Sequence, residues 1–120
     1  MENGVLSLCI NTPNSPVNIL DETTVKQLIE IFSAIDTETV KLIYLTSAKQ
    51  NSFLNGTSLL LTSQSTQDRD FIARKGSEFF AAYEAISQCS VTTLADIDGT
   101  CWGCGLELAL CFDYRIAANA

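Results

Sequence analysis

A run near the end of the chain, Asp98-Gly-Thr-Cys-Trp-Gly-Cys-Gly-Leu-Glu-Leu-Ala-Leu-Cys-Phe-Asp-Tyr-Arg-Ile-Ala117, contains a turn, a helix and the start of a strand. Its glycines follow the strand-forming residues Val91–Ile97 and predict a tight turn there. Alanine and leucine then favour a short helix from Gly103 to about Phe112, and Tyr114–Ala117 predicts another strand. Strand, helix and strand in this order are typical of a βαβ unit, whose two strands run parallel.

The same alternation extends toward the beginning of the chain. The predicted strands there are Val5–Ile10 and Lys41–Thr46, and the predicted helices are one beginning after Asp21 and one from Arg69 to about Gln88. Asp21 is suited to cap its helix, and an apolar stripe follows it (Val25, Leu28, Ile29, Phe32 and Ile35). Residues 49–57 are interpreted as a polar connection, residues 59–61 are ambiguous, and residues 62–68 are interpreted as a loop. The whole pattern predicts one α/β domain with a mainly parallel sheet covered by helices.

Composition narrows the class of function. The net charge is −7 with a pI near 4.3, and seven basic residues form no patch, which argues against nucleic acid as a partner. No apolar run approaches the length of a membrane span, and the first residues lack the features of a signal peptide. Five cysteines make a poor disulfide framework. We therefore expect a soluble protein in a reducing, cytoplasmic compartment, without nucleic acid or membrane as partner.

Two of those cysteines form a Cys-x-x-Cys motif, Cys101-Trp-Gly-Cys104. The motif lies between a predicted strand and a predicted helix, where a thioredoxin-like dithiol would be found. This leaves a thiol-disulfide oxidoreductase as an alternative function. A zinc site needs four ligands, and the chain has neither a second such motif nor a histidine, so no metal is expected.

A second chemical feature is the glycine-rich turn Gly99–Gly105 with Glu107 just beyond it. A helix start presents backbone N–H groups that suit a phosphate or a developing oxyanion. Glu107 is the one acid in an apolar helix, and beside such amides it could position and deprotonate a water. Taken alone, an ordinary tight turn and a solvated surface glutamate are the simpler interpretations.

Three segments in order nevertheless resemble the enoyl-CoA hydratase/isomerase (crotonase) superfamily. The run from Asp98 to Ala117 resembles its signature G-x-x-x-G-G-G-x-E-L-A-x-x-x-D-x-R-I-A. Residues 51–58, Asn-Ser-Phe-Leu-Asn-Gly-Thr-Ser, lie where that family has F-x-x-G-x-D. Residues 14–20, Asn-Ser-Pro-Val-Asn-Ile-Leu, resemble its P-x-N-x-L region, particularly that of the multifunctional fatty-acid oxidation proteins.

The resemblance implies a fold and a chemistry. The fold would be a spiral of β-β-α units that assembles as trimers or dimers of trimers, with residues 1–120 forming the N-terminal part of one crotonase-like domain. The substrate would be an acyl-CoA thioester, so coenzyme A enters with the substrate and no separate cofactor is expected. By position, the backbone N–H groups of Thr57 and Cys104 would form the oxyanion hole, and Glu107 would be the first catalytic glutamate. Asn55, Gly56, Thr57 and Gly103 would line the substrate site.

The chain also departs from the family pattern. Cys104 stands where the family has glycine, Ser58 where it has aspartate, and no basic residue lies within residues 14–18 to meet coenzyme A phosphates. Hydratases use a second glutamate at a position that would fall beyond Ala120, so we expect no turnover by these 120 residues alone. The leading hypothesis is hydration of a 2-enoyl-CoA. A Δ3,Δ2-enoyl-CoA isomerase or another crotonase reaction, the dithiol oxidoreductase and an inactive interaction subunit remain alternatives.

Overall fold

The computed structural model describes residues 2–56 and 69–118, with the side chains of residues 69–72 and 75 outside the description. The predictions made above for Thr57, Ser58, residues 59–61 and residues 62–68 therefore lie outside the described residues. The strands are β1 (Val5–Ile10), β2 (Leu42–Ser47), β3 (Ser52–Leu54), β4 (Thr92–Ile97), β5 (Thr100–Cys101) and β6 (Tyr114–Ala117). The helices are α1 (Glu22–Ser33), α3 (Arg69–Ser87) and α4 (Cys104–Leu110).

The main sheet has the order β1-β2-β4-β6 and every neighbouring pair in it is parallel. Its four strands are those that the sequence predicts, each within about one residue at its ends. The register pairs Val5 with Leu42, Leu42 with Thr92, and Leu94 with Tyr114. The prediction of an α/β fold with a mainly parallel sheet is confirmed.

A second, two-stranded parallel sheet pairs β3 with β5 and corrects the sequence interpretation. Residues 49–57 are not simply a polar connection, because Ser52, Phe53 and Leu54 form a strand that is buried along its whole length. The turn after β4 likewise contains β5. Strands this short carry no readable alternation, which is why the pattern missed them. With them included, the chain reads β2-β3-α3 and β4-β5-α4, two β-β-α units.

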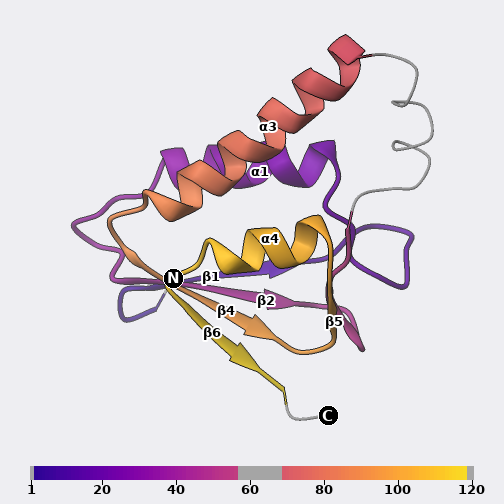
Figure 1. The fold of residues 1–120 in the computed structure, drawn as a ribbon. Helices are drawn as coiled ribbons and strands as arrows, with labels where there is room; N and C mark the ends of the chain where they lie inside the picture. Colours follow the sequence, from indigo (N-terminus) through magenta and orange to yellow (C-terminus); the bar gives the residue numbers. More distant parts are fainter. Residues whose placement is uncertain (1, 57–68, 119–120) are drawn as a thin grey trace.

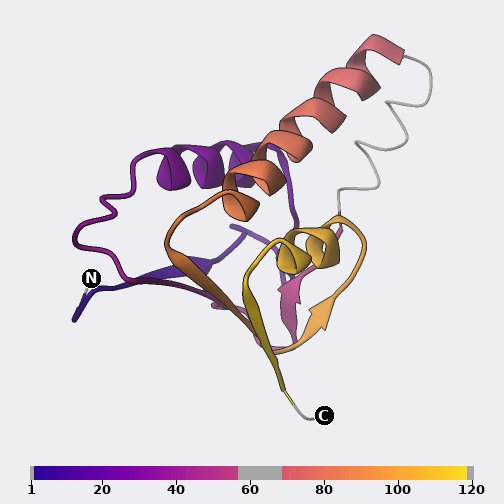
Figure 2. The same ribbon diagram turned by 60° about the vertical axis from the view of Figure 1, so that its left-hand side comes forward.

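The three helices lie on one side of the main sheet, with α1 and α3 packed against each other and α4 close to the sheet (Figure 1). The small sheet stands beside α4 and rises from the carboxyl ends of β2 and β4 (Figure 2). One large cluster fills the space that these elements enclose (Ile10, Leu20, Val25, Leu28, Leu45, Phe53, Leu54, Phe79, Ala82, Ile86, Ala95, Leu108, Ala109 and Phe112). The apolar stripe predicted for α1 supplies part of that core, and buried residues of α3 supply another part.

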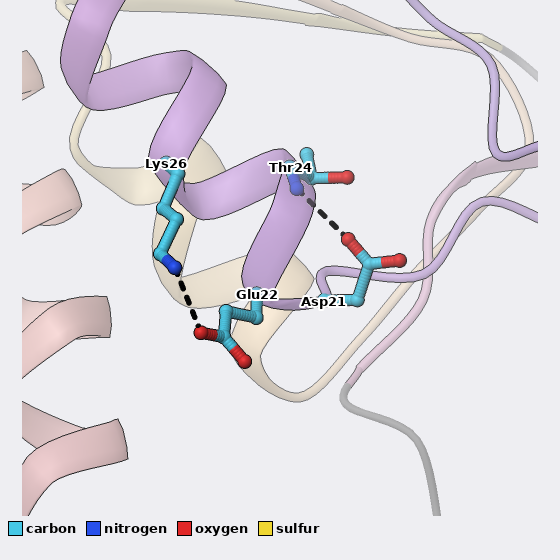
Figure 3. A network of polar contacts seen from close by, with 4 residues as sticks. All are labelled: Asp21, Glu22, Thr24 and Lys26. Carbon is cyan, nitrogen blue, oxygen red and sulfur yellow. Dashed lines mark hydrogen bonds and ion pairs between the residues drawn. The ribbon is translucent and has the colours of Figure 1, made fainter.

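Helix α1 begins as the sequence predicts. The Asp21 carboxylate accepts a hydrogen bond of 2.8 Å from the Thr24 backbone N–H, so it caps one of the free donors of the first turn. Glu22 and Lys26 form an ion pair one turn apart on the same face (Figure 3). That pair is exposed and adds little stability.

The end of α4 explains two polar residues of the C-terminal motif. Asp113 accepts a hydrogen bond from the Thr93 backbone N–H, and the Thr93 hydroxyl accepts one from the Asp113 N–H, both at 2.9 Å. Arg115 donates to the Phe112 carbonyl at 2.8 Å and reaches two carbonyls of the last turn of α4 at 3.5 Å. The two side chains thus join the end of α4 to β4 and β6.

None of the helices in the described part of the chain has the length and apolarity that a bilayer crossing requires.

Candidate active site

Two backbone segments far apart in the sequence meet at the amino end of α4. A methyl group placed on Gly56 would lie 3.7 Å from the Cys104 nitrogen, and one placed on Gly103 would lie 3.5 Å from the Gly56 Cα. The backbones at Gly56 and at Cys104 are therefore so close that one methyl group between them would touch both. These are the segments that the sequence assigns to the oxyanion hole, although Thr57 itself lies outside the described residues.

Close packing of α4 on the small sheet brings these segments together. At Gly105 a methyl group would lie 2.2 Å from the Leu54 carbonyl oxygen and 3.1 Å from that of Asn55. No side chain fits at those distances, so glycine lets the first turn of α4 rest on the backbone that leads to Gly56. Gly99 has a similar role at the start of β5, where its φ is +116° and a methyl group would lie 2.4 Å from the Ser52 nitrogen.

Cys104 occupies its position without backbone strain. The left-handed conformation falls on the residue before it, since Gly103 has φ 57° and forms the N-cap of α4. Cys104 is the first helical residue and is not among the described residues with positive φ. A cysteine in place of the family's glycine is therefore sterically acceptable to the backbone here.

Glu107 lies one turn into α4, and its N–H donates to the Gly103 carbonyl at 3.0 Å. The side chain is exposed. Its neighbours in the sequence, Leu108 and Ala109, are fully buried, so the apolar face of the short helix is directed into the core. The structure thus places the predicted glutamate on the helix that also carries Gly103 and Cys104, on its accessible side.

A buried asparagine that sequence reasoning did not single out supports this site from below. Asn18 has no exposed surface, and its backbone carbonyl accepts a hydrogen bond of 2.8 Å from the Asn55 N–H. Its side chain and N–H bond to the Ile10 carbonyl, the Thr12 N–H, the Ser47 hydroxyl, the Ser52 hydroxyl and the Phe53 carbonyl, all between 2.8 and 3.1 Å. Asn18 therefore joins the ends of β1 and β2 to β3 and fixes the backbone just before Gly56.

Asn55 is held from its side chain as well. The Thr100 hydroxyl on β5 donates to the Asn55 carboxamide oxygen at 2.6 Å. The loop after β1 contains no basic residue at positions 14–18, but a lysine from another segment contacts it. Lys49 donates to the Thr12 and Ser15 carbonyls at 2.6 and 2.7 Å.

Tyr83 on α3 is the other residue that the sequence analysis did not assign to the site. Its hydroxyl donates to the Cys104 carbonyl at 3.3 Å. Burial raises the pKa of Tyr83, and the Cys104, Glu107 and Cys111 side chains act in the same direction. The phenol is accordingly neutral throughout the physiological range.

The Cys-x-x-Cys pair is divided between two elements, with Cys101 in β5 and Cys104 at the first position of α4. Neither of these two cysteines forms a disulfide. Burial raises the pKa of Cys101. A reactive dithiol requires the opposite shift, toward a stable thiolate.

In the β-β-α units, the first strands lie in the main parallel sheet and the second strands form the small sheet. The glycine-rich start of α4 packs on a second strand. Together these features define a crotonase-type fold. The chain belongs to the enoyl-CoA hydratase/isomerase family, whose model matches residues 1–120. The alpha subunit of the fatty acid oxidation complex from Vibrio campbellii is 31% identical in an alignment of 122 positions that covers 99% of this chain. The chain spans 17% of the length of that relative.

Solved structures agree with this assignment. An enoyl-CoA hydratase from Bacillus halodurans is similar with a TM-score of 0.85 at 26% identity, over 98% of this chain and 47% of that one. An enoyl-CoA hydratase/carnithine racemase from Magnetospirillum magneticum has the same fold, with a TM-score of 0.89 at 24% identity over 98% of this chain and 44% of that one.

Proposed function

We propose that this chain contributes to the hydration of a 2-enoyl-CoA thioester. The observation that carries the proposal is the approach of the Gly56 backbone to the Cys104 nitrogen, with Glu107 one turn further along α4. This arrangement supports an oxyanion hole made of the Thr57 and Cys104 N–H groups. Asn55, Gly56 and Gly103 would line the same substrate site.

In the proposed reaction the two N–H groups bind the thioester oxygen. The Glu107 carboxylate takes a proton from a water as the water oxygen bonds to C3, and the electrons of the C2–C3 double bond move into the thioester to form an enolate. The enolate then takes that proton from Glu107 at C2, which gives a 3-hydroxyacyl-CoA and restores the Glu107 carboxylate. Donors fixed in advance where negative charge develops are an effective means of lowering such a barrier.

Turnover is tested on a protein in which residues 1–120 continue into the rest of a family domain, called the extended protein below, because the chain covers less than half of the solved structures it matches. Glu107→Gln keeps the size of the side chain but removes the base. We expect kcat to fall about 10²- to 10⁴-fold, as is typical when a positioned acid/base is lost. KM should change little, because the carboxylate acts on water rather than on the thioester.

Two further variants make this test specific. Glu38→Gln alters an exposed glutamate in the connection between α1 and β2 and should leave kcat unchanged. Cys104→Gly should retain activity or increase it, because only its backbone N–H is used. Near-full activity of Glu107→Gln together with loss of activity in Cys104→Gly would overturn the assigned roles and favour chemistry at the thiol.

Product analysis separates the hydratase from the isomerase. A 3-hydroxyacyl-CoA from a 2-enoyl-CoA supports hydration, whereas exchange between 3-enoyl and 2-enoyl thioesters without added water supports the isomerase. We further propose that the extended protein assembles as a homotrimer or hexamer in the cytoplasm, which sedimentation equilibrium and cell fractionation would test.

A further inference from the structure

The residues at the amino end of α4 do little themselves to fix the position of this helix. Its N-cap is Gly103, which makes no side-chain capping hydrogen bond, and the helix has only seven residues. A glycine cap also leaves the backbone freer than any other residue would. Contacts from other elements must therefore fix the position of Cys104.

Contacts with β3 and with α3 hold this part of α4. The first is the close packing of Gly105 on the Leu54 carbonyl, which sets the distance between α4 and the small sheet. The second comes from the opposite direction, where the Tyr83 hydroxyl on α3 donates to the Cys104 carbonyl. Tyr83 is half-buried and packs against the main core cluster, so its ring is fixed before the hydroxyl makes this bond.

The residues that influence Tyr83 from α4 and its C-cap are Cys104, Glu107 and Cys111. Their spacing along the helix places them on one stripe that is directed toward α3. The same stripe contains the proposed oxyanion donor and the proposed catalytic base. A phenol beside this stripe can fix the rotation and position of α4 where both groups depend on it.

We propose that Tyr83 is a positioning residue for the oxyanion hole: its hydroxyl, bonded to the Cys104 carbonyl, holds the first turn of α4 so that the Cys104 N–H stays aimed at the thioester oxygen. This inference rests on the proposed function. It requires a phenol that remains a donor, which is consistent with the direction in which burial moves the Tyr83 pKa. The bond length of 3.3 Å is long for an O–H···O hydrogen bond, so a moderate effect is expected.

The chain offers a matched control. Tyr83→Phe removes one hydroxyl and keeps the ring in the core. Tyr44→Phe removes one hydroxyl that donates to the Asp96 carboxylate across β2 and β4. Ile43 and Leu45 face the core, so Tyr44 between them points to the other face of the sheet, away from the helices.

The first measurement uses the 120-residue chain and needs no ligand. In Tyr83→Phe we expect the ¹³C resonance of the Cys104 carbonyl and the N–H resonance of Gly105 to shift. The Gly105 amide, which donates to the Trp102 carbonyl in the first turn of α4, should exchange with solvent about 3- to 10-fold faster, as fits the loss of one hydrogen bond. Tyr44→Phe should leave all three unchanged. Identical spectra around Cys104 in Tyr83→Phe and the unsubstituted chain would overturn the contact and the inference with it.

The second measurement uses the extended protein. Tyr83→Phe should lower kcat about 3- to 10-fold with KM within about twofold, because the lost hydrogen bond matters most when the oxyanion forms. Tyr44→Phe should keep kcat. A merely structural role for Tyr83 would lower the unfolding temperature and leave kcat of the folded enzyme unchanged, and that result would also overturn the inference.

A third measurement separates this inference from the proposed reaction. A bound 3-oxoacyl-CoA forms an enolate that absorbs in the near ultraviolet, and the oxyanion donors stabilise it without any hydration. If the extended protein does not hydrate 2-enoyl-CoA but Tyr83→Phe lowers the bound enolate about 3- to 10-fold, the proposed reaction is wrong and the role of Tyr83 stands. If hydration occurs and neither kcat nor the enolate changes in Tyr83→Phe, only the Tyr83 inference is wrong. Absence of both hydration and enolate in the unsubstituted protein would overturn both.

Discussion

Gly105→Ala should destabilise the chain although alanine is the better helix former. The added methyl group would lie 2.2 Å from the Leu54 carbonyl oxygen and 2.8 Å from its carbonyl carbon, both backbone atoms that cannot rotate away. Overpacking of this kind costs up to about 3 kcal/mol, and the gain in helix propensity returns at most about 1 kcal/mol. We expect a net loss of about 2 kcal/mol in the free energy of unfolding, with α4 displaced from β3.

Gly76→Ala provides the matched control, because the same substitution in α3 meets nothing within 4 Å. Here only the propensity term remains, and the free energy of unfolding should rise by about 0.5–1 kcal/mol. Urea denaturation followed by circular dichroism measures both variants under one set of conditions. Equal or higher stability of Gly105→Ala relative to the unsubstituted chain would refute the close approach of α4 to the small sheet, and with it the proximity of Gly56 and Cys104.

Three further predictions concern single side chains. Asn18→Asp removes the buried donors to the Ile10 and Phe53 carbonyls and should lower the free energy of unfolding by about 3 kcal/mol. Asn14→Asp, in the exposed part of the same loop, is the control and should change the free energy of unfolding by less than about 0.5 kcal/mol. Urea denaturation measures both variants. Because burial raises the Cys101 pKa, Cys101 should react with iodoacetamide more slowly than the exposed Cys9 at neutral pH and reach its maximal rate at a higher pH than a free thiol. Mass spectrometry of the labelled peptides measures both rates. A Cys101 thiolate already present near pH 6 would favour the redox alternative. Because the pKa of Tyr83 is raised in the folded chain, the unfolded chain loses the phenol proton at a lower pH than the folded chain does. The stability that this group contributes is therefore complete below pH about 10 and is lost as the pH rises beyond it. Ultraviolet titration should show a late tyrosinate step that Tyr83→Phe removes, and an unchanged titration curve in that variant would contradict the prediction.

Long, periodic elements of this fold were predictable from the sequence. The capping carboxylate of Asp21 and the stripe beginning at Val25 lead to α1, and the apolar run after Lys41 leads to β2. The two short strands were not predictable. Ser52–Leu54 is buried along its whole length because α4 and the core cluster pack against it, and such burial depends on elements distant in the sequence.

The candidate site shows the same division. The glycine-rich turn and Glu107 were recognisable, because helix starts and lone acids in apolar helices have readable patterns. Asn18, Lys49 and Tyr83 were not, since their importance arises from contacts across many residues, as between Tyr83 and Cys104. No local periodicity encodes a hydrogen bond between the side chain of one helix and the backbone of another.

The register of the main sheet also bears on how the chain folds. Each parallel pair must close a loop before it gains its hydrogen bonds, and the loop is shortest between Leu94 and Tyr114 and longest between Leu42 and Thr92. The longer loop is roughly two and a half times the shorter, which adds about 0.8 kcal/mol of closure entropy. The segment from β4 to β6, which carries Cys104 and Glu107, is therefore the part of the sheet able to close earliest. Substitutions in it should slow folding, whereas those at the β1–β2 pairing should mainly accelerate unfolding.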